Sequence, residues 1–148
     1  MKPRLGNRAG NAMIEFALGS GILLLAFAGT FQFGYTFLQY NNLENAVARG
    51  ARYASLYPYD STTTTPSALF IGNVKNMVVY GSPSAGTSPA LPGLTTGNVN
   101  LTVIFTNGVP SGMTVSISGY SINAVFSNST LTNKPQITYA YQGVWTPV

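Results

Sequence analysis

The sequence has no cysteine, no histidine and few charged residues of either sign. Charged side chains make up 7% of the 148 residues, against about 25% in an ordinary soluble protein. The acidic residues are Glu15, Glu44 and Asp60. This inventory excludes disulfides, catalysis by Cys/His or Ser/His/Asp groups, and most metal sites. We therefore expect no enzymatic activity, no bound metal and no cofactor.

The net charge of +4 is concentrated at the amino terminus. Lys2, Arg4 and Arg8 supply three of the seven cations. From Asn11 onward, four cations stand against three acids, a net charge of +1. A nucleic-acid-binding surface needs a stripe of Lys and Arg that follows the phosphates, and the sequence contains no such stripe. We therefore predict no nucleic-acid partner.

A long uncharged stretch follows the basic residues. No side chain from Phe16 to Leu43 is charged, and the part up to Leu38 is largely Ala, Leu, Ile, Phe and Gly. About 20 apolar helical residues cross a hydrocarbon core of about 30 Å, so this stretch is long enough to span a bilayer. Because the positive flank precedes it, we predict a cytoplasmic amino terminus and translocation of everything after Tyr40.

The helical pattern continues beyond the apolar stretch. No proline occurs between Pro3 and Pro58. Apolar residues recur at helical spacings in this region: Leu43, Ala46, Val47, Ala51 and Ala54. These features predict one helix from about Ala12 to Leu56, on the order of 65 Å long at 1.5 Å per residue.

The chain after Pro58 predicts a small head with both helix and strand. The run Thr62 to Thr65, closed by Pro66, is typical of a linker. Residues 81–97 hold three prolines and four glycines, which predicts an exposed loop. Between these segments, apolar residues at three- and four-residue intervals predict a second helix: Leu69, Phe70, Val74, Met77 and Val78.

Alternating apolar and polar residues predict antiparallel strands after residue 97. The first strand is marked by Val99, Leu101, Val103 and Phe105, before a turn at Asn107-Gly108. The next run has Met113, Val115 and Ile117 in one phase and Tyr120, Ile122 and Ala124 in the other, and the last strand has Ile137, Tyr139 and Tyr141. The phase change predicts a β-bulge at Gly119. We expect an α+β fold with three or four antiparallel strands and a helix across one face.

Gly10 and Glu15 stand in a distinctive arrangement at the edge of the apolar stretch. The sequence from Gly10 is Gly-Asn-Ala-Met-Ile-Glu-Phe, so Glu15 lies five residues after a glycine. This placement resembles the processing site of type IV pilin-like proteins. The resemblance implies that a prepilin peptidase cuts between Gly10 and Asn11, and that Glu15 and Phe16 serve assembly.

A second stretch narrows the resemblance. The sequence Arg-Gly-Ala-Arg-Tyr-Ala-Ser at residues 49–55, with Asn-Asn-Leu at 41–43 and Asn-Ala at 45–46, is similar to the TadE-like pilin family of tight-adherence pili. The similarity covers about residues 8–57. It implies a basic leader at 1–10, a membrane and filament helix at 11–57, and an extracytoplasmic head at 58–148.

The resemblance implies a structural function without catalysis. The subunit, major or minor, would wait in the inner membrane with its head outside and then enter a filament at the cell surface. The implied partners are other pilins, a prepilin peptidase, and an assembly ATPase with its membrane platform. Ala26, Thr30 and Gly34 form a small-residue ridge at four-residue spacing, which favours close helix packing; a lipid-facing helix with incidental small residues is the alternative.

An ordinary secretory signal peptide is the alternative interpretation of the amino terminus. Ala26-Phe27-Ala28 follows a basic region and the apolar residues 22–25, as at a signal-peptidase site. Cleavage after Ala28 would release a secreted β-rich binding module. Against this alternative, the apolar run continues to Leu38, and Glu15 would interrupt the signal.

Glu15 needs a cation if it becomes buried, because an unpaired buried charge costs several kcal/mol or simply protonates. No Lys or Arg lies between Arg8 and Arg49. On one continuous helix Arg49 would be about 50 Å away from Glu15. The amine of Asn11, which exists only after cleavage, would be close enough on the same or a neighbouring subunit.

Overall fold

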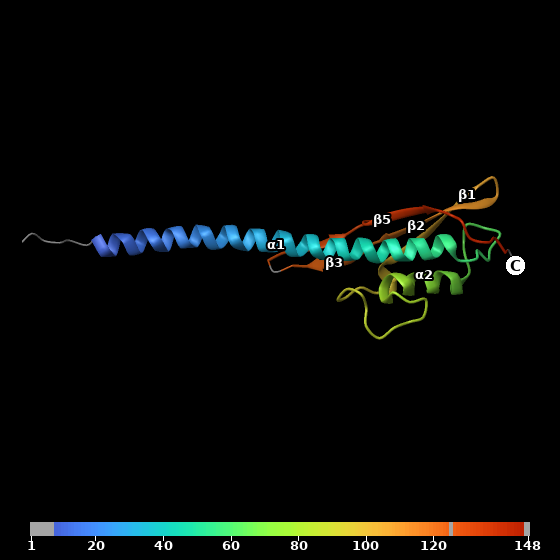
Figure 1. Ribbon diagram of the computed structural model, residues 1–148, viewed down its shortest axis with the longest axis horizontal. Helices are drawn as coiled ribbons and strands as arrows, with labels where there is room; N and C mark the ends of the chain where they lie inside the picture. The colour runs from blue at the N-terminus through green and yellow to red at the C-terminus, as the bar shows by residue number, and fades with distance from the viewer. Residues whose placement is uncertain (1–7, 125, 147–148) are drawn as a thin grey trace, which may run out of the picture. The chain divides into compact units, whose positions relative to one another are not determined.

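The computed structural model describes residues 8–124 and 126–146, with side chains from residue 10 onward. The chain divides into two compact units, Met1–Tyr35 and Thr36–Val148. The first contains the beginning of a long helix. The second, which we call the head unit, contains the rest of that helix and every other helix and strand that the structure describes (Figure 1).

The elements follow one another as two helices, a short 3₁₀ turn and then strands. Their bounds are α1 Arg8–Leu56, α2 Ala68–Tyr80, η1 Thr96–Asn98, β1 Val99–Thr106, β2 Val109–Ile117, β3 Tyr120–Asn123, β4 Asn128–Leu131 and β5 Gln136–Ala140. The predicted α+β class, with a long amino-terminal helix, a short second helix and antiparallel strands, is confirmed.

The long helix α1 is uninterrupted within the described residues. It begins at Arg8 rather than near Ala12, so residues 8–10 of the predicted leader are helical. It ends at Leu56, because Pro58 disfavours the helical conformation for the residue before it. From Gly10 onward α1 is long and apolar enough to cross a membrane, by length and composition.

The second helix, α2, has a capping group at each end. The Ser67 hydroxyl accepts a hydrogen bond from the Phe70 amide at 3.1 Å, which satisfies an N–H of the first turn. At the other end, Gly81 adopts φ 73° and donates to the Met77 carbonyl, as a helix-ending glycine does. The predicted second helix is therefore confirmed.

The strands form two antiparallel sheets, where we expected one sheet of three or four strands. One sheet has the order β1-β2-β5, and β3 pairs with β4 in a separate two-stranded sheet. The β1–β2 hairpin turns at Asn107-Gly108, both with positive φ (53° and 79°), which suits the twist of a two-residue hairpin. The predicted alternation along β1 is confirmed, while β4, which is exposed and polar, was not predicted.

The predicted β-bulge at Gly119 is wrong. Gly119, with φ 70°, follows the end of β2, and the chain then enters β3 in the other sheet. The phase change in the sequence therefore marks a break between two strands. The β1–β2 ladder does shift register, but between Ile104 and Phe105, where Ser111 is the extra residue.

The core of the head unit is built from α1, α2 and the sheets. Fully buried side chains include Leu43, Val47 and Ala51 of α1, Phe70, Val74 and Val78 of α2, and Val99, Met113 and Val115 of the strands. In Figure 1, α2 lies along the second part of α1, and the close approach of Gly50 to Val78 confirms that contact. The predicted loop 81–97 is mostly exposed, but Leu91 and Leu94 are buried and join the core.

Candidate functional site

The first unit presents a helix whose apolar side chains are exposed. The large ones between residues 13 and 33 keep 56 to 77% of their surface accessible: Met13, Ile14, Phe16, Leu18, Ile22, Leu23, Leu24, Leu25, Phe27, Phe31 and Phe33. Contiguous exposed apolar surface of this extent marks a contact with protein or membrane. This exposed surface is consistent with a helix that lipid or other protein chains cover.

The residues predicted for processing and assembly all lie in α1 and are exposed: Gly10, Asn11, Glu15 and Phe16. A Cβ placed on Gly10 would meet nothing within 4 Å. The Gly10–Asn11 bond lies within the span of α1. Because both residues are exposed, the fold of this chain does not bury the predicted cleavage site. Five residues correspond to about 140° around a helix, which places the Glu15 carboxylate on a different side from Gly10.

Ala26, Thr30 and Gly34 follow one another along the exposed surface of the same helix. The Thr30 hydroxyl donates a hydrogen bond to the Ala26 carbonyl at 3.0 Å. The hydroxyl proton of Thr30 is therefore engaged within its own helix. Nothing lies within 4 Å of a Cβ placed on Gly34. The predicted ridge is therefore open, with room for another helix or for lipid.

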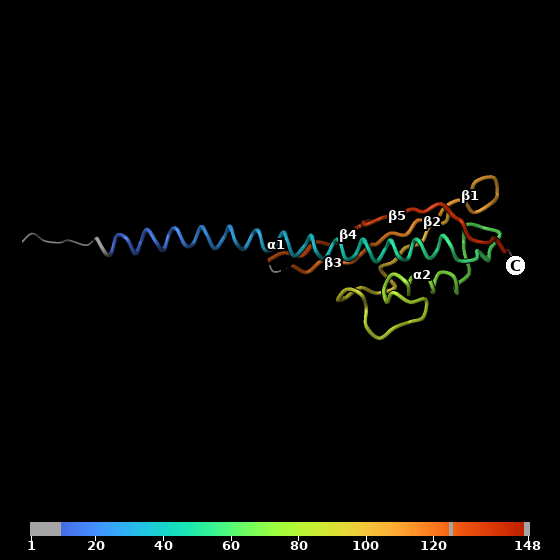
Figure 2. The backbone as a smooth tube through the Cα atoms, viewed as in Figure 1, coloured from blue at the N-terminus to red at the C-terminus, as the bar shows by residue number. Residues whose placement is uncertain are grey.

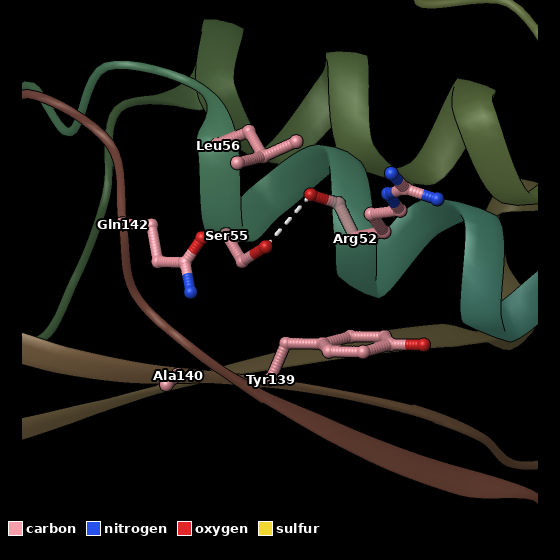
Figure 3. Close-up of a pocket in the computed structure, with 6 residues that line it drawn as sticks. All are labelled: Arg52, Ser55, Leu56, Tyr139, Ala140 and Gln142. Carbon is pink, nitrogen blue, oxygen red and sulfur yellow. Dashed lines mark hydrogen bonds between the residues drawn. The ribbon is translucent and has the colours of Figure 1, made fainter.

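In the head unit a hollow of about 360 Å³ lies between the end of α1 and strand β5 (Figure 3). It is lined by Arg52, Ser55, Leu56, Tyr139, Ala140 and Gln142. A second hollow shares Arg52 and Tyr139 and extends along α1 past Asn45, Ala48 and Arg49. Together they form a shallow groove, which we call the α1–β5 groove, with two guanidinium groups and an aromatic ring that is 40% exposed.

The carboxyl-terminal segment fixes one end of this groove. The Gln142 amide donates to the Ser55 carbonyl at 2.8 Å, which ties the chain after β5 to the last turn of α1. Figure 2 shows this segment returning beside the chain that follows α1. The Tyr141 hydroxyl accepts from the Tyr59 amide at 2.8 Å and lies 2.8 Å from the Val144 carbonyl, to which it can donate. We call these contacts the carboxyl-terminal clasp.

Burial raises the pKa of both the Tyr59 and Tyr141 hydroxyls above the ordinary value of 10.0. Hydrogen bonds act in the opposite direction on both groups and are the smaller effect. The two rings pack edge to face at 6.3 Å. The hydroxyls are therefore structural and stay protonated at neutral pH.

Sequence reasoning did not predict the α1–β5 groove or the clasp. Tyr141 was predicted as a residue of the last strand, but β5 ends at Ala140. Arg49 and Arg52 were predicted as part of a family-like stretch. The groove forms because β5 pairs with β2 at the edge of the sheet, and no local pattern indicates that pairing. Within residues 10–124 and 126–146, no three His, Cys, Asp or Glu side chains come together as a metal site would require.

Residues 10–52 match the family described as TadE-like protein. The predicted resemblance is confirmed for this segment. No curated protein and no solved structure matches the chain.

The TadE-like segment covers less than a third of the chain, and it includes the exposed apolar helix but only the α1 arginines of the α1–β5 groove. It begins at Gly10 and contains Glu15, the ridge, and the arginines of the groove up to Arg52. The match associates the protein with tight-adherence pili. Its apolar helix is consistent with membrane anchoring. The part of the head after Arg52 lies outside the match.

Proposed function

We propose that this protein is a structural, non-enzymatic pilin-like subunit of a tight-adherence pilus. The observation that carries the proposal is the TadE-like match of residues 10–52 on a helix whose apolar side chains are exposed. A helix of this kind is covered by lipid before assembly and by other helices afterwards. The subunit therefore moves from the inner membrane, with its head outside, to a filament at the cell surface.

Maturation removes residues 1–10. A prepilin peptidase cuts between Gly10 and Asn11, and the remaining helix is then extracted by an assembly ATPase and its membrane platform. The exposed ridge of Ala26, Thr30 and Gly34 supports close packing against the helices of other pilins.

Cleavage supplies the partner that Glu15 needs. Once Arg8 is removed with the leader, no Lys or Arg precedes Arg49, so a Glu15 carboxylate buried among apolar helices has no side-chain cation nearby on its own helix. The new amine of Asn11, on the same subunit or a neighbour, provides the positive charge. In this mechanism only a processed subunit can enter the filament without an unpaired buried charge.

The amino-terminal residue of the mature protein tests the processing step. We expect Asn11 in the wild-type protein and an uncut chain in the Gly10→Leu variant. The matched control is Gly19→Leu, where a Cβ also meets nothing within 4 Å, and it should be cut normally. Normal cutting of Gly10→Leu would contradict the assigned site. Gly29 as the first residue would instead indicate the secreted module released after Ala28, and Met1 an uncut signal anchor.

The charge of Glu15 tests the assembly step. The Glu15→Gln variant should insert into the membrane and fold its head, because the residue is exposed on α1, but it should be missing from sheared pilus fractions. Glu15→Asp, which keeps the charge, is the control and should assemble. Normal incorporation of Glu15→Gln would overturn the pairing with the Asn11 amine without affecting the family match.

A reporter fused after the last residue tests the topology. Lys2, Arg4 and Arg8 precede the apolar stretch, so the reporter should be active outside the cytoplasm. A cytoplasmic reporter would refute both the pilin and the secreted-module interpretations.

A further inference from the structure

The part of α1 in the head unit has one buried and one exposed side. Leu43, Ala46, Val47, Gly50, Ala51 and Ala54 are buried. The exposed side carries Glu44, Asn45, Arg49 and Arg52. At 100° per residue, Arg49 lies about 140° and Arg52 about 80° around the helix from Glu44. One edge of the exposed side is therefore acidic, and the basic side chains lie between its middle and the other edge.

These charges have no opposite partner on their own helix at a productive spacing. Side chains on one helix pair at three- or four-residue separations, whereas Arg49 and Arg52 follow Glu44 by five and eight residues. The remaining acid of the head, Asp60, is already engaged, because its carboxylate accepts hydrogen bonds from the Ser67 amide and hydroxyl. The arginines therefore line the α1–β5 groove as an unbalanced positive patch.

We propose that this face is a contact between copies of the chain, in which Glu44 of one copy pairs with Arg49 or Arg52 of the next. The complementary charges on one helix face argue for this partner. The proposed contact is heterologous: each copy offers its acidic edge to one neighbour and its basic side chains to the other, so the contact can repeat without closing. Tyr139 lines the groove beside the two arginines.

The pairing also fixes how far neighbouring copies are shifted along the helix. Glu44 lies five residues from Arg49 and eight from Arg52, which at 1.5 Å per residue correspond to rises of about 7.5 and 12 Å. Neighbouring copies with parallel helices should therefore be displaced by a distance in this range. This inference rests on the proposed function, since a repeating contact of this kind builds a filament.

Disulfide trapping tests the contact, and the chain has no cysteine of its own. The double variants Glu44→Cys/Arg49→Cys and Glu44→Cys/Arg52→Cys are expressed as the full chain and oxidised in intact cells. The rise of about 7.5 Å between the closer pair already exceeds the Cα separation that a disulfide spans. Any bridge therefore joins two copies.

We expect a ladder of dimers, trimers and larger species that collapses under reductant for at least one of the two double variants. The control, Asn100→Cys/Ile104→Cys on the exposed positions of β1, should remain monomeric. Dimers without larger species would show a closed two-fold contact and overturn the proposal, as would monomers alone. If the wild-type chain is present in sheared filaments while both variants stay monomeric, the contact fails and the proposed function stands. Absence of the wild-type chain from filaments overturns both.

Charge reversal provides a second measurement that does not depend on disulfide geometry. Glu44→Lys, or Arg49→Glu with Arg52→Glu, should reduce incorporation into filaments about tenfold or more, the size of an interface ion pair. The combined triple variant inverts both edges and should recover most of the loss. Lys134→Glu, exposed elsewhere on the head, is the control and should assemble normally. Failure of the triple variant to recover would overturn the pairing.

Discussion

At Gly50, α1 lies so close to α2 that adding one methyl group tests their packing. A Cβ added to Gly50 would overlap Cγ2 of Val78 and stand 3.5 Å from the carbonyl oxygen of Val74. Val78 has little freedom to move, because a β-branched side chain on a helix strongly prefers one rotamer and this one is fully buried. The Gly50→Ala variant must therefore push α2 away from α1.

The expected effect is the balance of two terms. Overpacking of this kind typically costs about 1–3 kcal/mol, while replacing glycine by alanine inside a helix gains up to about 1 kcal/mol. We therefore expect Gly50→Ala to lower the free energy of unfolding by about 1–2 kcal/mol. The control, Gly72→Ala in α2, meets no atom within 4 Å and should raise it by about 0.5–1 kcal/mol.

The assay is urea unfolding of the full chain in detergent, followed by the fluorescence of Trp145, whose indole N–H bonds to Ser61 in the head unit. The double variant Gly50→Ala/Val78→Ala gives the decisive comparison. With the valine methyl groups removed, the added methyl at position 50 has room, so Gly50→Ala should stabilise the Val78→Ala background. If Gly50→Ala is as stabilising as Gly72→Ala in the wild-type background, the close-contact argument is refuted.

Further predictions concern the carboxyl-terminal clasp. Because burial raises the pKa of Tyr59 and Tyr141, the unfolded chain ionises first, and the free energy of unfolding should be level below about pH 9 and fall as pH rises past 10. Tyr141→Phe should flatten this alkaline decline and cost about 1–2 kcal/mol at neutral pH through two lost hydrogen bonds, both measured by urea unfolding across pH. Gly143→Ala should cost about 1–3 kcal/mol, because its Cβ would stand 2.7 Å from the Tyr57 carbonyl oxygen; thermal unfolding should show no such loss for Gly97→Ala, where the nearest atom is at 3.6 Å.

The sequence by itself determined the features that depend on neighbours along the chain. The absence of proline before Pro58 and the apolar run predicted α1, and the three- and four-residue spacing around Val74 predicted α2. The two-residue period predicted β1, and Asn107-Gly108 predicted its hairpin. The order of Gly10 and Glu15 before an uncharged helix was enough to indicate a family. In each case the signal lies within a few residues, where local sterics and side-chain periodicity act.

Only the tertiary structure decided the features that depend on pairing between distant segments. The break at Gly119 looks like a bulge in the sequence, because a phase change says nothing about which sheet the next strand joins. The composition of the loop, rich in glycine and proline, predicts that Leu91 and Leu94 are exposed. In the structure both side chains are buried and pack in the hydrophobic core. The α1–β5 groove requires β5 to reach β2, and the clasp requires Gln142 to reach Ser55. Long-range contacts of this kind are selected by the burial of shared apolar surface, so no local pattern records them.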